Sequence, residues 1–209
     1  MSSRRYEDYW TEPSPSPLTD PRTPDRRAFL WKRVASSGTG GLRLLDCGAG
    51  DGGLVTEAKS RGHRAAGLEL SAAAIELAHR ANPDTDLRQH SVEELPWPVE
   101  AAAWDVVVSF EVIEHLLEPR ALLQGAHDAL VPGGALFLST PYHGLLKNLA
   151  VTALRFEKHF AVDGDHIRFF TDGALRRLLE DNGFRIVETA HVGRFWPLWA
   201  NTVVWATKS

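Results

Sequence analysis

A glycine-rich segment and two acids near it are the residues of this chain with the most distinctive chemistry. Gly48 and Gly50 follow an apolar run, and Asp46 stands two residues before the first of them. Glycines at this spacing let the backbone turn sharply and let a ligand lie against bare main chain. Glu69 comes about 20 residues later, at the end of the next apolar run, where a carboxylate can accept hydrogen bonds from both hydroxyls of a ribose. These residues predict a nucleoside-binding site.

The glycine spacing fits more than one class of ligand. Gly48, Gly50 and Gly53 match G-x-G-x-x-G, so the loop alone does not separate NAD from S-adenosylmethionine. Asp46 favours the second, because a carboxylate at this place suits a cationic amino-acid end and would repel a pyrophosphate. The chain is also short for the second domain that many dehydrogenases carry. A nicotinamide-dependent oxidoreductase stays open as the alternative, and so does a strand–helix turn without a ligand.

A second group of ionisable residues directly follows the most strand-like run, residues 104–110. Glu111, Glu114 and His115 would share one face if a helix begins there, because their spacing is i, i+3 and i+4. Two carboxylates and an imidazole on one face could hold a divalent cation. Alternatively, the acids only favour a helix N-terminus and His115 is their neighbour.

Strand-like and helical segments alternate over most of the chain, which predicts βαβ units and a parallel sheet covered on both faces. Two later β-rich runs are separated by a short connection and should pair antiparallel. The predicted strands are residues 42–47, 63–70, 86–89, 104–110, 135–140, 185–191 and 201–207. The predicted helices are residues 25–35, 52–61, 72–81, 172–181 and one that follows residue 110 and ends near Leu130.

Four motifs occur in the order typical of one family. They are LLDCGAGDGG with Glu69 after it, SVEELPW, DVVVSFEVIEHL and LVPGGALFLSTP. Together they resemble the class I S-adenosylmethionine-dependent methyltransferases, over about residues 28–192. The resemblance implies an α/β fold with a Rossmann-like, seven-stranded, mostly parallel sheet that ends in a C-terminal antiparallel hairpin, with helices on both faces.

The resemblance also implies which residues contact S-adenosyl-L-methionine. The glycine loop and Asp46 would hold the methionine end, and Glu69 the ribose. Ser91 and Val92 would flank the adenine, and Phe110 would line the sulfur side. The expected cofactor-binding set is Asp46, Gly48, Ala49, Gly50, Glu69, Leu70, Ser91, Val92 and Phe110.

E-x-x-E-H after the fourth strand is similar to two branches of the family. One is the ubiquinone-biosynthesis O-methyltransferases, and the other is the small-RNA 3′-end 2′-O-methyltransferases, which by resemblance use two Glu and two His on one metal. His166 stands where both branches place a histidine before an aromatic pair and a helix. A divalent cation such as Mg²⁺ would then be held by Glu111, Glu114, His115 and His166. Without a metal, His115 or His166 would act as the catalytic general base.

We expect an N-terminal arm over residues 1–23 and a methyltransferase domain over residues 24–209, with residues 143–170 as a substrate lid or insert. Residues 143–160 repeat apolar positions every four residues, which predicts an amphipathic helix. Such a helix could pack on the domain, cover the acceptor or contact a membrane surface peripherally. The ubiquinone enzymes carry an insertion at the same place.

Composition limits the possible functions. The chain has 209 residues, one cysteine and a net charge of −4. A single cysteine excludes an internal disulfide, and the negative charge disfavours a nucleic-acid partner. No apolar stretch looks like a signal peptide or reaches the roughly 18–20 residues of a membrane helix, so we expect a cytoplasmic protein. The favoured activity is O-methylation of a small-molecule hydroxyl, of quinone or secondary-metabolite type, with RNA 3′-end 2′-O-methylation as the alternative acceptor chemistry.

Overall fold

The structure is a computed structural model that describes residues 10, 22–36, 38, 40–159 and 167–209. Within these residues the strands are β1 (Arg43–Cys47), β2 (Arg64–Glu69), β3 (Leu87–Gln89), β4 (Trp104–Phe110), β5 (Leu130–Pro141), β6 (Phe184–Val192) and β7 (Asn201–Lys208). They form one sheet in the order β3-β2-β1-β4-β5-β7-β6. Strands β1 to β5 run parallel, and β7 runs antiparallel to both of its neighbours. The predicted Rossmann-like sheet with a C-terminal antiparallel pair is confirmed.

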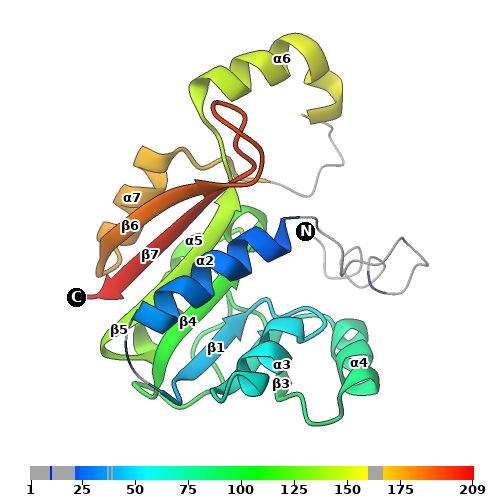
Figure 1. Cartoon of the computed structure of the whole chain (residues 1–209), viewed down its shortest axis with the longest axis vertical. Coiled ribbons are helices and arrows are strands. Elements are labelled where there is room, and N and C mark those ends of the chain that lie inside the picture. Colours follow the sequence, from blue (N-terminus) through cyan, green and yellow to red (C-terminus); the bar gives the residue numbers. More distant parts are fainter. Residues whose placement is uncertain (1–9, 11–21, 37, 39, 160–166) are drawn as a thin grey trace.

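Helices cover both faces of this sheet. The described helices are α2 (Thr23–Ser36), α3 (Gly53–Ser60), α4 (Ala72–Ala81), α5 (Pro119–Ala129), α6 (Leu145–His159) and α7 (Asp172–Glu180). Leu30 of α2 and Val55 of α3 pack in one buried cluster with Phe137 of β5, on the face that is in front in Figure 1. Leu123 of α5 and Leu179 of α7 belong to the cluster on the other face. Burial of each such side chain stabilises the fold by about 1.5–3 kcal/mol, so the sheet is held from both sides.

The parallel strands end at one common edge of the sheet, which we call the carboxyl edge. Cys47, Glu69, Phe110 and Pro141 are the last residues of β1, β2, β4 and β5 at this edge. The strand order reverses between β1 and β4. Ligands of open α/β sheets bind in the crevice outside such a reversal, so we expect a ligand site at the loops that follow β1 and β4.

The connection after β4 differs from the sequence prediction. A helix was expected to begin at Glu111, but this residue has a left-handed backbone with φ of 54°. A single 3-10 turn follows at Ile113–His115, and α5 begins only at Pro119. A left-handed backbone lies outside the α-helical region, so Glu111 is not itself a helical residue, and a proline is favoured at the first helical position. The prediction that Glu111, Glu114 and His115 share one helix face is therefore wrong.

Strand β5 also begins earlier than predicted. The sequence, with a turn signal from Val131 to Gly134, predicts a strand only from residue 135, whereas β5 already begins at Leu130. Leu130 pairs with Trp104, and the register then shifts before Val106. An irregularity of this kind admits extra residues into a strand, which a local turn signal does not reveal.

Helix α6 extends away from the sheet. Figure 1 shows it beyond the end of β5, beside the connection between β6 and β7. The predicted amphipathic helix is confirmed, but its leucines do not pack on the domain: Leu145 is 74% exposed and Leu154 is 82% exposed. Most of the predicted arm 1–23 and residues 160–166 of the predicted insert lie outside the described residues.

Candidate active site

The glycine loop lies at the carboxyl edge, between β1 and α3. Gly48 and Gly50 both have left-handed backbones, with φ of 80° and 54°. The amides of Gly48 and Ala49 donate to the carbonyl of Leu68, at 2.8 and 3.0 Å, which ties the loop to β2. A β-carbon at position 48 would overlap the side chain of Val112. Only glycine fits there, so bare main chain meets the connection that follows β4.

Glu69 is held beneath this loop with its carboxylate oriented by main-chain donors. The side chain is 1% exposed, and one oxygen accepts from the amide of Gly50 at 2.8 Å. The other oxygen accepts from the amide of Ser71, also at 2.8 Å. These two amides fix the carboxylate of Glu69 next to the glycine loop, at the end of β2. This arrangement fits the predicted ribose contact of Glu69.

Asp46 is a second buried acid at the same place. It is 4% exposed, and burial raises its pKa to about 7, against the attraction of Arg27 and with added repulsion from Glu69 and Asp51. A nearby positive charge would stabilise the ionised form of such a buried aspartate and would lower its pKa. The loop region is therefore suited to a cationic ligand and unsuited to a diphosphate.

The other residues predicted to contact the cofactor lie around the same edge. Val92 is buried, and its carbonyl accepts from the indole of Trp97 at 3.2 Å, while the Ser91 hydroxyl accepts from the amide of Glu93. Leu70 is 41% exposed directly after β2. Phe110 packs edge-on against Phe137, with ring centroids 5.3 Å apart. Their contacts with the cofactor stay predictions.

The acids after β4 are engaged in hydrogen bonds within the protein. Glu111 accepts from the Ser139 hydroxyl at 2.6 Å and from the Asn201 amide at 2.5 Å. Glu114 is fully buried, and its carboxylate accepts from the Thr140 hydroxyl at 3.2 Å. Burial, with repulsion from Glu111, raises the pKa of Glu114 well above its usual range. Ser139 and Thr140 are consecutive strand residues, so they bind these two carboxylates from opposite faces of the sheet.

The predicted metal set is not assembled by the described residues. Nowhere in residues 22–154 and 167–209, apart from positions 37 and 39, do three His, Cys, Asp or Glu side chains gather as metal ligands. His166 lies outside the described residues, so its part in the set stays a prediction. His115 is partly buried in the turn after β4.

A polar network at this edge was not found from the sequence. Arg26 of α2 is 4% exposed and donates to the side chain of Asn201 at 3.3 Å, which in turn donates to Glu111. The hydrogen bond from Arg26 to Asn201 joins residues 175 positions apart in the chain, so no local sequence pattern could have indicated this network. The network fixes the carboxylate of Glu111 beside the end of β4.

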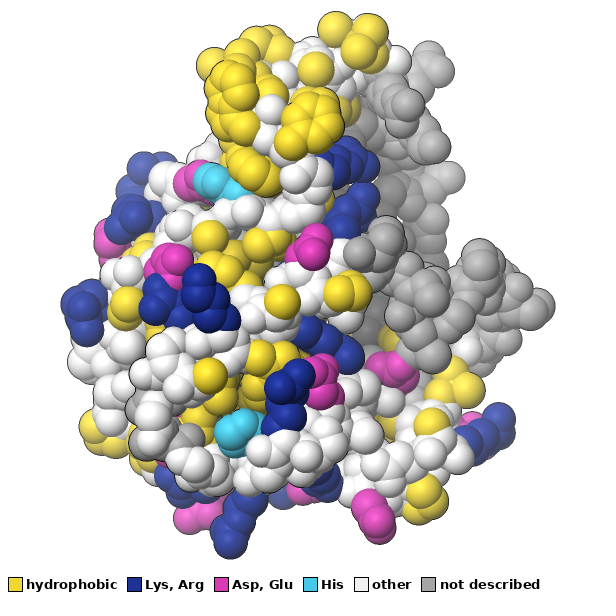
Figure 2. Space-filling model, viewed as in Figure 1, with side chains coloured by type: hydrophobic (Ala, Val, Ile, Leu, Met, Phe, Trp, Pro, Cys, Tyr) yellow, Lys and Arg dark blue, Asp and Glu magenta, His cyan; other side chains and the backbone are white. Residues whose placement is uncertain are grey.

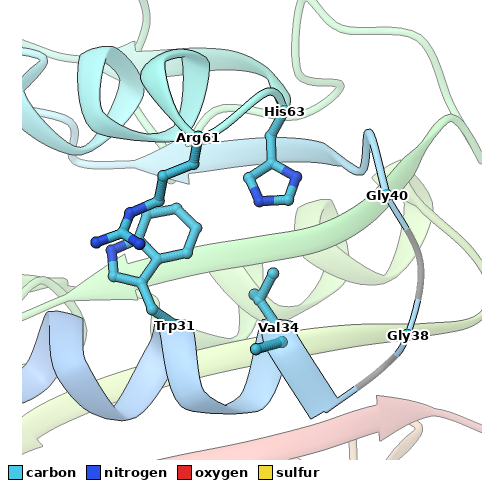
Figure 3. Close-up of a pocket in the computed structure, with 7 residues that line it drawn as sticks. Trp31, Val34, Gly38, Gly40, Arg61 and His63 are labelled. Carbon is cyan, nitrogen blue, oxygen red and sulfur yellow. The ribbon is translucent and has the colours of Figure 1, made fainter.

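A separate cavity of about 400 Å³ lies away from these residues. Figure 3 shows its lining by Trp31 and Val34 of α2, by Arg61 and His63 before β2, and by glycines before β1. The guanidinium of Arg61 lies 4.5 Å from the centre of the Trp31 ring. Because these residues precede the strands, the cavity is at the amino edge of the sheet, opposite the glycine loop.

Comparison with known proteins identifies the family. A family model described as "Methyltransferase domain" matches residues 19–189, which is most of the chain. The chain belongs to the class I S-adenosylmethionine-dependent methyltransferases. Its cofactor is therefore S-adenosylmethionine, in agreement with the anionic, glycine-lined region at the end of β1. The family found from the four sequence motifs is confirmed.

Two curated relatives are similar over different lengths. The methyltransferase is 32% identical over 137 residues to the ubiquinone biosynthesis O-methyltransferase of Xanthomonas campestris pv. campestris (strain B100). This match covers 63% of this chain and 55% of the relative. The chain thus spans little more than half the length of that enzyme. It is 30% identical over 190 residues to a Mycolicibacterium smegmatis protein named "Probable S-adenosylmethionine-dependent methyltransferase", over 86% of this chain and 70% of the relative.

Solved structures share the fold at low identity. The magnesium protoporphyrin IX methyltransferase of Synechocystis PCC 6803, with bound S-adenosylhomocysteine, has a TM-score of 0.72 at 16% identity and covers 99% of this chain and 94% of its own. The 1,6-didemethyltoxoflavin-N1-methyltransferase of Burkholderia thailandensis has a TM-score of 0.66 at 21% identity and covers 100% of this chain and 84% of its own. These likenesses support the architecture and not the acceptor.

The raised pKa of Asp46 predicts opposite effects of Asp46→Asn on stability and on cofactor binding. Between its ordinary value of 3.8 and about 7 the folded protein holds a proton that the unfolded chain has lost, so ionisation of Asp46 destabilises the fold as the pH rises. The substitution Asp46→Asn should therefore increase the free energy of unfolding, and this increase should be larger near pH 8 than near pH 5 by about 2–3 kcal/mol. Loss of the anion should weaken S-adenosylmethionine binding by at least about tenfold.

Denaturant titration at both pH values and calorimetry with the cofactor check these effects. Asp86→Asn removes the same charge from an exposed side chain and should change neither quantity. Equal affinity of Asp46→Asn and the unmodified protein for S-adenosylmethionine would contradict the assigned role of this acid.

Proposed function

We propose that this methyltransferase transfers the methyl group of S-adenosylmethionine to a hydroxyl of a small molecule of quinone or secondary-metabolite type. The observation that carries the proposal is the pair of buried acids, Asp46 and Glu69, around bare glycine main chain at the carboxyl edge. The 32% identity to a ubiquinone biosynthesis O-methyltransferase supports a hydroxyl acceptor. The net charge of −4 supports a small molecule over RNA.

The chain's contribution to such a reaction is mainly positioning. The bond from the methyl carbon to sulfur breaks as the bond to the acceptor oxygen forms, the electron pair stays on sulfur, and the hydroxyl proton leaves to a base. The sulfonium is already a strong electrophile, so alignment and exclusion of water dominate. Glu111, held between Ser139 and Asn201, is proposed to line the acceptor side because it follows the end of β4.

Screening of acceptors tests this function directly. Calorimetry should detect binding of S-adenosylmethionine and S-adenosylhomocysteine and no binding of NAD. With a labelled methyl group, we expect transfer to phenols or catechols and none to short RNAs with a free 3′ end. Binding of NAD and of neither other ligand would support a nicotinamide-dependent oxidoreductase instead. Labelling of RNA and of no small molecule would support RNA 3′-end 2′-O-methylation instead.

We propose that His115 accepts the proton of the acceptor hydroxyl, with His166 as the second candidate base. We also propose that the reaction requires no metal. The support is that Glu111 and Glu114 already bind protein hydroxyls and an amide. We expect His115→Gln to lower kcat by about 100-fold with little change in the KM for the cofactor. Dialysis against EDTA should leave turnover within about twofold. A large loss on dialysis that Mg²⁺ restores would instead support a metal bound by the predicted set.

We further propose peripheral contact of α6 with an anionic membrane surface. Exposed apolar side chains on α6 and on the connection between β6 and β7 form a patch that we call the apolar cap, seen at the top of Figure 2. Its members are Leu145, Leu146, Leu149, Leu154, Phe195 and Trp196. No helix in the described part of the chain is long and apolar enough to cross a membrane, so contact would be superficial.

Basic side chains beside the apolar cap support this lipid partner. Burial, together with repulsion from Arg194 and Arg22, lowers the pKa of Lys147 to about 8, which means that these cations crowd together. Dark-blue side chains lie directly below the cap in Figure 2. Apolar side chains flanked by cations are suited to a surface of anionic headgroups over acyl chains.

Vesicle sedimentation tests the lipid contact. The protein should sediment with vesicles of phosphatidylglycerol and phosphatidylcholine and less with phosphatidylcholine alone. Leu149→Glu should reduce the bound fraction by about tenfold, because it puts a charge into the apolar cap. Leu77→Glu, on α4, is the matched control and should bind as the unmodified chain does. Equal binding of the two variants would remove the membrane contact from the proposal.

A further inference from the structure

Trp10 is far from the glycine loop in sequence and touches it in the fold. Its indole is partly buried, and two carbons of its six-membered ring, Cη2 and Cζ2, lie 3.1 and 3.2 Å from where a β-carbon on Gly50 would be. A methyl group at position 50 would therefore crowd the ring. Position 50 needs glycine for two reasons: its left-handed backbone and the approach of this indole.

The residue that Trp10 covers is itself part of the cofactor region. The amide of Gly50 donates to Glu69, the acid proposed to bind the ribose. Trp10, Gly50 and Glu69 are thus successive members of one chain of contacts. Buried Asp46 is close enough to repel the charge of Glu69, so the indole stands beside a region with two acids. An aromatic ring there adds apolar area beside this region, and the π-face of an indole attracts cations.

We propose that Trp10 forms an outer wall of the S-adenosylmethionine site and that its π-system stabilises the positive sulfonium of the cofactor, an inference that rests on the proposed cofactor role of the glycine loop. The acids on one side and the ring on the other would enclose the positive charge. S-adenosylhomocysteine lacks the sulfonium charge, so the ring should contribute less to binding of this product. Trp10 would then help the enzyme to prefer its cofactor over its spent form.

A purely structural role of Trp10 makes a different prediction. If the indole only attaches the N-terminal segment to the domain, its removal would lower stability and leave ligand affinity unchanged. Cofactor affinity, measured for both the charged and the uncharged ligand, is therefore the deciding readout. A leucine at position 10 retains an apolar side chain without a ring, whereas a phenylalanine retains an aromatic ring. Comparing the two separates the effect of apolar contact area from the effect of the aromatic π-system.

Calorimetry with the full chain tests the proposal with Trp10→Ala, Trp10→Leu and Trp10→Phe. We expect Trp10→Ala and Trp10→Leu to raise the Kd for S-adenosylmethionine about tenfold and that for S-adenosylhomocysteine about threefold or less, and Trp10→Phe to stay within about threefold for both. Trp196→Ala, which removes a 69% exposed indole from the apolar cap, is the control and should bind both ligands normally. If Trp10→Ala does not fold, the Leu and Phe variants carry the same comparison.

The outcomes separate this inference from the proposed function. Unchanged affinity of a folded Trp10→Ala or Trp10→Leu variant for S-adenosylmethionine would overturn the role of Trp10 and leave the glycine loop intact as the cofactor site. Equal weakening for both ligands would overturn the charge-dependent part. Failure of the unmodified chain to bind S-adenosylmethionine would instead reject the cofactor site itself.

Discussion

Burial of two carboxylates at the end of adjacent parallel strands is the constraint around which the active site is built. Glu69 is stabilised by two main-chain amides, whereas burial raises the pKa of Asp46 to about 7. An ionised buried acid destabilises a fold unless a positive charge offsets it. In the proposed site the positive charge of S-adenosylmethionine would supply this offset to Asp46. Part of the stability lost by burying Asp46 would then favour binding of a cationic ligand.

The connection after β4 shows how the same edge limits the acceptor chemistry. Glu111 has a left-handed backbone and Glu114 is fully buried, so this segment is a tightly held turn. Strand β5 provides Ser139 and Thr140 as hydrogen-bond donors to these acids, one on each face. The hydrogen bonds to Glu111 and Glu114 therefore hold the turn after β4 in one shape at the carboxyl edge.

Local patterns predicted much of the fold because their signals lie within a few residues. Helix α4, with its serine cap, and strand β4, with its run of valines, have the predicted bounds. The start of α5 was wrong because the conformation of Glu111 depends on Ser139 and Asn201, which are distant in sequence. The contact of Trp10 with Gly50 was missed for the same reason.

The sequence by itself determined the family and the cofactor, because four motifs occur in the order typical of the family and each is a local pattern of a few residues. It also determined the order of strands and helices, since apolar periodicity is local. Only the tertiary structure decided which polar groups are already engaged: Arg26, Asn201 and Glu111 meet across the chain, and the leucines of α6 stay exposed. The physical reason is that burial and hydrogen-bond partners depend on residues brought together from different elements, which no local pattern encodes.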